Sequence, residues 1–165
     1  MNLADALILK QLLHEQIDTL TEEIENVAFI SIEATESIPT IQSRSLQDIE
    51  MELEHIRLDL RQLDRLIQEE NVRSVVETHD GPLPLVEAIE LAIQLRVQAR
   101  LYEKLSLRPK KEYVHGVAVI KHALYDPELY RLKARDIKKR AIRIESAIQA
   151  VRHQADIEFD ASRYM

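Results

Sequence analysis

Apolar residues recur at alternating intervals of three and four positions between Leu46 and Ile67, and charged residues fill most of the positions between them. The apolar positions are Leu46, Ile49, Leu53, Ile56, Leu60, Leu63 and Ile67. This alternation is the heptad a/d pattern of a coiled coil, so it predicts a helix over residues 46–70 with one narrow apolar seam. Such a helix cannot bury its seam alone, and at least one partner helix must lie along it.

The same alternation appears towards both ends of the chain. One seam predicts a helix over residues 3–27 and consists of Leu3, Ala6, Lys10, Leu13, Ile17, Leu20, Ile24 and Val27. Another predicts a helix over residues 128–155 and consists of Tyr130, Ala134, Ile137, Ala141, Ile144, Ile148, Val151 and Ala155. Lys10 can set the register or the oligomeric state, or its stem can lie on the seam while its ammonium reaches water. We expect the second arrangement.

A helix over residues 85–105 is predicted to be the most deeply buried. Its first apolar stripe consists of Leu85, Ala88, Ala92, Leu95, Ala99 and Tyr102, and a second stripe beside it consists of Ile89, Ile93 and Val97. Two adjacent stripes, with small alanines in one of them, predict close neighbours on two sides.

Two stretches rich in β-branched residues, residues 72–78 and 113–120, flank this third helix. A turn at residues 79–82 follows the first of them. We expect the two stretches to pair with each other as a small ribbon at one end of the bundle. The residues after Asp156 are mostly polar, so we expect this tail to fray, although Phe159 can pack back onto the helices.

These elements predict an all-α fold. It is an antiparallel bundle of about four long heptad-patterned helices, to which a small two-stranded β ribbon is added. The 165 residues fit one domain over residues 1–165 and are enough to bury a core.

Composition and charge argue against several classes of function. The chain has no cysteine, which excludes disulfides, thiolate metal sites and a cysteine nucleophile. Its formal charge of -7 argues against general nucleic-acid binding, which needs a basic surface. No run of about 18 uncharged apolar residues predicts a membrane span, and the first residues lack the basic segment of a secretory signal. We therefore expect a cytoplasmic protein without a membrane partner.

One stretch of the last predicted helix is basic, although the first two helices are acidic. Its charged residues are Arg131, Lys133, Arg135, Lys138, Lys139, Arg140 and Arg143, against Asp136 alone. This stretch can bind nucleic acid, an acidic polymer or anionic lipid, or it can complement the acidic helices of the same bundle or of a neighbouring subunit. We favour the complement, because no aromatic residues are interleaved to stack on bases.

Several acidic and histidine pairs have the helical spacing of metal ligands. Glu52 and His55 form a Glu-x-x-His pair, as in di-iron bundles, but a second such pair is missing. His14 with Asp18 is another candidate pair. Counted from the seam, Glu52 and His55 take flanking and outer positions, so we expect a surface pair.

His153 with Asp156, and Glu87 with Glu90, have the same kind of spacing. The Glu-x-x-Glu pair resembles half of a magnesium site, but a second acidic motif is missing, and Glu87 suits the first turn of a helix. The chain also lacks a phosphate-binding loop and a serine elbow. We therefore assign no catalytic residue and no cofactor, and we expect that the protein is not an enzyme.

With the helices placed, three segments resemble a family of small bacterial helical proteins of unknown function that are often labelled septicolysin. The segments are MNLADALILKQLLHEQIDTL, LDRLIQEENVRSVVETHDGPLPLVEAIELAIQLR and YVHGVAVIKHALYDPELYRLKARDIKKRAIRIESAIQ. The resemblance implies a helical fold and self-association, and it transfers no catalytic residue. The label implies a thiol-activated membrane-lysing toxin, and the lack of cysteine argues against that activity here.

The seams exceed what one small bundle needs, so we expect a non-enzymatic helical bundle that forms a homo-oligomer or docks a partner helix. The alternative is a bundle that binds a small molecule or a metal, with a site near His14, Glu52, His55 or Glu87. The order of the oligomer and the identity of any ligand are left open by the sequence.

Overall fold

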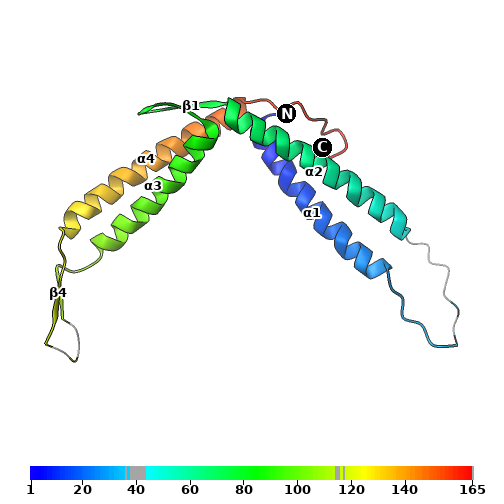
Figure 1. Cartoon of the computed structure of the whole chain (residues 1–165), viewed down its shortest axis with the longest axis horizontal. Helices are drawn as coiled ribbons and strands as arrows, with labels where there is room; N and C mark the ends of the chain where they lie inside the picture. The colour runs from blue at the N-terminus through cyan, green and yellow to red at the C-terminus, as the bar shows by residue number, and fades with distance from the viewer. Residues whose placement is uncertain (36, 38–43, 114–115, 117, 165) are drawn as a thin grey trace. The chain divides into compact units, whose positions relative to one another are not determined.

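The computed structural model describes residues 1–35, 37, 44–113, 116 and 118–164, which form four helices and four short strands (Figure 1). The helices are α1 (Leu3–Val27), α2 (Leu46–Arg73), α3 (Leu85–Ser106) and α4 (Pro127–Gln154), and the strands are β1 (Val75–Thr78), β2 (Gly81–Pro84), β3 (Lys111–Tyr113) and β4 (Ile120–His122). The predicted fold class is confirmed as far as a mostly all-α protein with small β ribbons. None of the helices among these residues is long and apolar enough to cross a membrane.

The chain divides into two compact units, which we call unit 1 (residues 1–70 and 153–165) and unit 2 (residues 71–152). Unit 1 contains α1 and nearly all of α2, and unit 2 contains both ribbons, α3 and nearly all of α4. The packing of all four helices in one domain over residues 1–165 stays a prediction.

Unit 1 is built on an antiparallel hairpin of α1 and α2, which lie side by side in Figure 1. The buried residues are Leu3, Ala6, Leu9, Leu13 and Leu20 of α1 and Ile49, Leu53, Ile56, Leu63 and Ile67 of α2. The Asn2 side chain caps α1 by accepting a hydrogen bond from the Asp5 backbone N–H at 2.8 Å. All of these buried residues except Leu9 belong to the seams that the sequence predicted, but the coiled-coil pattern itself stays a prediction.

Lys10 lies at the edge of this seam and forms an ion pair with Asp64 of α2. The hydrogen bond from the Lys10 ammonium holds the pKa of the Asp64 carboxyl below its usual value. The Lys10 side chain is partly exposed, and its charge meets a carboxylate across the hairpin as well as water. The prediction that its stem lies along the seam stays a prediction.

The tail after α4 is fixed to unit 1, so the prediction that it frays is wrong. The Ile157 N–H donates to the Met1 carbonyl at 2.8 Å, and the Leu3 N–H donates to the Ala155 carbonyl at 2.8 Å. The Ile157 side chain is only 4% exposed. Near its end, the Tyr164 hydroxyl donates to the Asp59 carboxylate at 2.6 Å. One apolar residue and a short backbone pairing thus hold a segment whose composition is mostly polar.

The contact between Tyr164 and Asp59 gives a prediction about alkaline pH. Burial and the neighbouring carboxylate raise the pKa of Tyr164 to about 12. Because the folded state keeps this phenol protonated, its contribution to stability is complete below pH ~10 and is lost as the pH rises through about 12. We expect Tyr164→Phe to lower the free energy of unfolding by about 1 kcal/mol at neutral pH. In an alkaline titration followed by ultraviolet absorbance, this variant should also lack the tyrosine that ionises at the highest pH.

Tyr113→Phe is the control for this prediction, because Tyr113 is 73% exposed. That variant should keep the late titration step. A late step that persists in Tyr164→Phe would show that another tyrosine causes it.

Unit 2 is built on an antiparallel hairpin of α3 and α4. Arg96 pairs with Glu145 at 3.1 Å, and Lys138 pairs with Glu103 at 3.3 Å, across the two helices. The buried residues are Leu85, Ala88, Ala92, Leu95 and Ala99 of α3 and Ala134, Ala141, Ile144 and Ile148 of α4. The first predicted stripe of α3 is therefore the one that faces α4.

Among the described residues of unit 2, another helix covers one face of α3, so the prediction of close neighbours on two sides is wrong for this unit. Ile93 and Val97 of the second stripe are 41% and 60% exposed. The reason is geometric: α4 is one helix with one seam, and it can cover one stripe of α3 only.

Each strand pairs with its neighbour in sequence, so the predicted pairing of residues 72–78 with residues 113–120 is wrong. β1 pairs with β2, with Thr78 opposite Gly81, and β3 pairs with β4, with Tyr113 opposite Ile120. Gly81 has a φ of 117° and Gly116 a φ of 86°, a region that glycine enters without strain. A glycine in each turn lets both ribbons close locally. Residues 114, 115 and 117 of the second predicted stretch lie outside the described residues.

Candidate functional site

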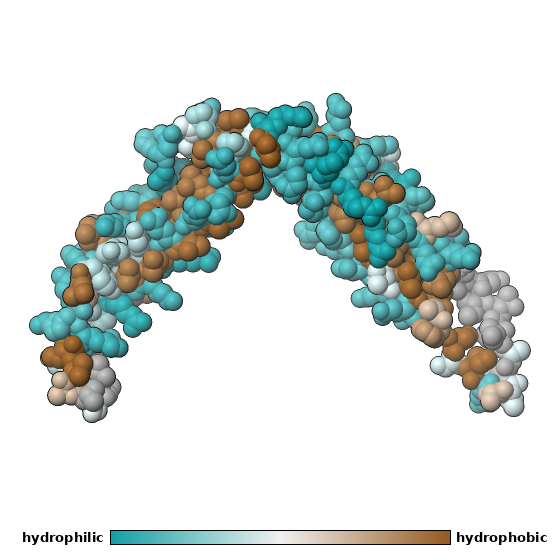
Figure 2. Space-filling view, viewed as in Figure 1, coloured by the Kyte–Doolittle hydropathy of each residue, from teal (hydrophilic) through white to brown (hydrophobic). Residues whose placement is uncertain are grey.

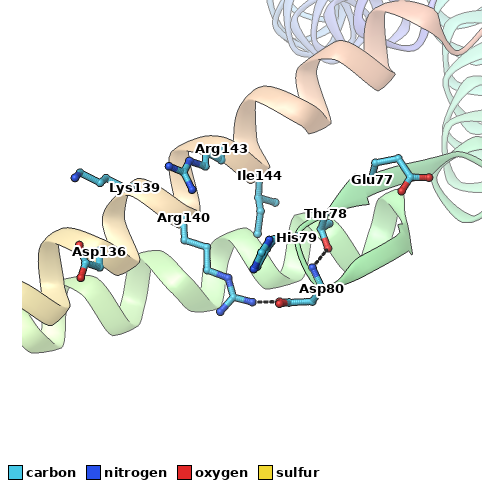
Figure 3. A pocket seen from close by; sticks show the side chains of 9 residues that line it. All are labelled: Glu77, Thr78, His79, Asp80, Asp136, Lys139, Arg140, Arg143 and Ile144. Carbon is cyan, nitrogen blue, oxygen red and sulfur yellow. Dashed lines mark hydrogen bonds and ion pairs between the residues drawn. The ribbon is translucent and has the colours of Figure 1, made fainter.

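A pocket in unit 2 lies where the turn between β1 and β2 approaches α4 (Figure 3). Its volume is about 420 Å³, and it is lined by Glu77, Thr78, His79, Asp80, Asp136, Lys139, Arg140, Arg143 and Ile144. The Thr78 hydroxyl fixes the turn by donating to the Gly81 carbonyl at 2.6 Å. An ion pair between Arg140 and Asp80 joins the turn to α4. His79 lies beside Ile144 and Arg140 in the centre of this view.

The charges around this pocket balance. Its lining has three carboxylates, from Glu77, Asp80 and Asp136, and three cations, from Lys139, Arg140 and Arg143. One cation and one carboxylate are already paired with each other. These carboxylates and cations leave no excess of charge that would select an anion or a cation, so the pocket does not define a class of ligand.

The metal-ligand candidates Glu52 and His55 lie on α2, at the edge of a second pocket. This pocket has a volume of about 440 Å³, and Tyr164 of the tail also lines it. Glu52 forms an ion pair with Arg44, which occupies one of its carboxylate oxygens. His14 lies on α1, is exposed and does not line this pocket. The described residues contain no group of three His, Asp or Glu side chains placed to hold a metal ion.

The remaining acidic and histidine pairs are not brought together into a site. Glu87 is exposed in the first turn of α3, as expected, and Glu90 accepts a hydrogen bond from Gln94 at 3.0 Å. His153 is exposed near the end of α4, and Asp156 forms a backbone bridge with Asn2.

Much of the basic stretch of α4 is paired within unit 2. Besides the pairs of Arg140 and Lys138 described above, Arg131 pairs with Glu128, and the Lys133 ammonium lies 5.0 Å from the centre of the Tyr130 ring. Arg135, Lys139 and Arg143 make no ion pair with a described residue. The stretch is therefore partly paired by carboxylates of α3, α4 and the β1–β2 turn, and its pairing with the acidic helices stays a prediction.

One face of α3 in unit 2 carries apolar side chains that are exposed to solvent. We call it the outer stripe, and it consists of Val86, Ile89, Ile93, Val97 and Leu101. Ile89 is half-buried, and the other four are between 41% and 60% exposed. Figure 2 shows apolar side chains along the hairpin of α3 and α4, between hydrophilic ones. The sequence indicated three of these five residues, but it placed them in the core.

Beside the outer stripe, a groove runs between α3 and α4. Two hollows of about 300 Å³ each lie along it, and Ala92, Ala99 and Ala141 are among their lining residues. Small side chains at these positions let another helix approach closely. Charged residues of the same hollows, such as Arg96 and Arg100, border the groove.

The fold and these surfaces define a mostly all-α protein built from helical hairpins. Its structure is similar to the crystal structure of a functionally unknown conserved protein from Corynebacterium diphtheriae, with a TM-score of 0.68 and 21% sequence identity over 96% of this chain and 99% of that chain. No family model and no curated protein matches the sequence. At this identity, the likeness shows the fold alone.

Proposed function

We propose that this protein is a non-enzymatic helical protein that associates with further copies of itself through the outer stripe of α3. The observation that carries the proposal is the exposure of Val86, Ile93, Val97 and Leu101 on one face of a helix whose opposite face is buried. Exposed apolar residues are ordinary when they are scattered, but a continuous apolar face marks an interaction site.

The free energy gained by covering this stripe is moderate. Each of these four side chains is about half exposed, so covering it completely contributes about 1 kcal/mol, or about 4 kcal/mol for the stripe. Because association costs at least about 4 kcal/mol, the stripe alone gives weak binding, and the groove beside it must contribute as well. We therefore expect a partner that covers both the stripe and the groove.

Sedimentation velocity of the unmodified chain tests this proposal. From about 1 to about 50 µM, we expect the mean mass to rise above 19.2 kDa as copies associate. A mass that stays at the monomer value over this range would contradict the proposal.

The absence of catalytic chemistry is part of the proposal. It is supported by the separation of the candidate acids and histidines, and by the pairing of Glu52 with Arg44. The alternative, binding of a small molecule or metal, has the pocket beside His79 as its best support. Elemental analysis of the purified protein, and melting with and without added metal, would favour the alternative if a bound metal or a shifted melting temperature were found.

A further inference from the structure

Charge is divided very unequally between the two units. Unit 1 contains 19 acidic and 6 basic residues, so its formal charge is -13. Unit 2 contains 10 acidic and 16 basic residues, so its formal charge is +6. These values give the net -7 of the chain. A contact between like units of two copies would oppose charges of the same sign, whereas a contact between unlike units would bring opposite charges together.

The outer stripe has a basic border in its C-terminal half. Arg100 and Lys104 each follow a stripe residue by three positions, after Val97 and Leu101, so they lie on the same side of α3. Both basic side chains are exposed, and neither makes an ion pair with a residue that the structure describes. A helix that covers Val97 and Leu101 therefore meets two unpaired cations.

In unit 1, one exposed face of α1 has apolar side chains next to carboxylates, which complement the apolar side chains and cations of the outer stripe. Ile8 is 66% exposed and Leu12 is 37% exposed. Glu15 and Glu22 follow Ile8 at intervals of seven residues, which places them on the same face. Both glutamates are exposed. This face of α1 therefore combines a short apolar edge with carboxylates, as a partner of the outer stripe requires.

We infer that the outer stripe of α3 is covered by the acidic unit 1 of a second copy, with α1 running in the same direction as α3 and with Ile8 and Leu12 against Ile93 and Val97. This inference rests on the proposed self-association and names the surface that takes part in it. The carboxylates of Glu15 and Glu22 lie towards Arg100 and Lys104 in this contact. Each chain then contributes one acidic and one basic surface, so the contact is heterologous: unit 1 of one copy meets unit 2 of another.

Charge reversal in the full-length chain tests the inference. Reversing both cations, Arg100→Glu with Lys104→Glu, should weaken self-association at least tenfold, because two attractive pairs become repulsive. Reversing both carboxylates, Glu15→Lys with Glu22→Lys, should weaken it by a similar factor. The chain that carries all four changes should recover most of the affinity, because every pair is then attractive again. This recovery also shows that the changes do not act by unfolding the helices.

Arg108→Glu with Lys121→Glu is the matched control. It changes the net charge of the chain by the same amount at two exposed positions of unit 2 outside α3. We expect its self-association to change less than threefold. A monomeric unmodified chain would overturn the proposed function and the inference together. Association that is weakened by the α3 changes but insensitive to Glu15→Lys with Glu22→Lys would leave the proposed function standing and overturn the inference.

Discussion

Glutamate in place of Val97 is expected to weaken self-association by about a hundredfold. Val97 is 60% exposed in the middle of the outer stripe, so a copy that covers the stripe must bury the new carboxylate. An unpaired carboxylate buried against apolar side chains costs about 3 kcal/mol, which corresponds to about two decades in the dissociation constant. Sedimentation velocity over a concentration series measures the change.

Gln98→Glu is the control for this variant. It adds the same charge one residue later, about 100° around the helix and outside the outer stripe. Gln98 is exposed, and its amide donates to the Tyr102 hydroxyl at 3.1 Å, a group to which a carboxylate can also bond. We expect its association to match that of the unmodified chain. If Val97→Glu and Gln98→Glu behave alike, the outer stripe is not the interface.

Leu63→Ala is expected to lower the free energy of unfolding of unit 1 by about 2–5 kcal/mol. Leu63 is fully buried in the seam between α1 and α2. We expect a loss within this range because the neighbours of a fully buried leucine relax only partly into the space that it leaves. Urea unfolding followed by circular dichroism measures it.

Leu58→Ala makes the same chemical change on the same helix at a side chain that is 55% exposed, and it should alter stability by about 0.5 kcal/mol or less. Hydrogen exchange then locates the effect of Leu63→Ala. Faster exchange in α1 and α2 alone would agree with two separate units. Equal acceleration in all four helices would instead show one cooperative domain, as the sequence predicted.

The helices could be predicted because the heptad pattern is local. α1 runs from Leu3 to Val27, as the seam predicted, and α3 ends at Ser106, close to the predicted residue 105. A seam of this kind predicts which face of a helix is buried, but it does not predict which other helix covers that face. The pairing of α1 with α2, and of α3 with α4, therefore came from the structure.

The errors occurred where partners had to be chosen. Residues 72–78 and 113–120 have strand-like composition, but composition does not tell a local hairpin from a distant pairing. The positive φ of Gly81 allows the tight turn that closes the local hairpin of β1 and β2. The second stripe of α3 was placed in the core because a single sequence does not show whether an apolar stripe faces the same chain or another molecule.

The candidate site was less predictable than the fold. The spacing of Glu52 and His55 is visible in the sequence, but the ion pair between Glu52 and Arg44 depends on the placement of Arg44, two residues before α2, which the sequence does not show. The pocket beside His79 joins residues that are about 60 positions apart. The acidic and basic helices were visible in the sequence, but the charge of each unit could be counted only after the boundary between the units was known.

The C-terminal tail packs against the first residues of the chain, and this affects the order in which the two units can finish folding. Unit 2 is one continuous segment, whereas unit 1 joins residues 1–70 to residues 153–165. The hydrogen bond from the Met1 ammonium to the Ile157 carbonyl spans 156 positions. During translation, α1 and α2 leave the ribosome first, but Ile157 and Tyr164 can reach them only after all of unit 2 has been synthesised. Unit 1 is therefore the first unit to begin synthesis, but it forms its last contacts only after unit 2 has been made.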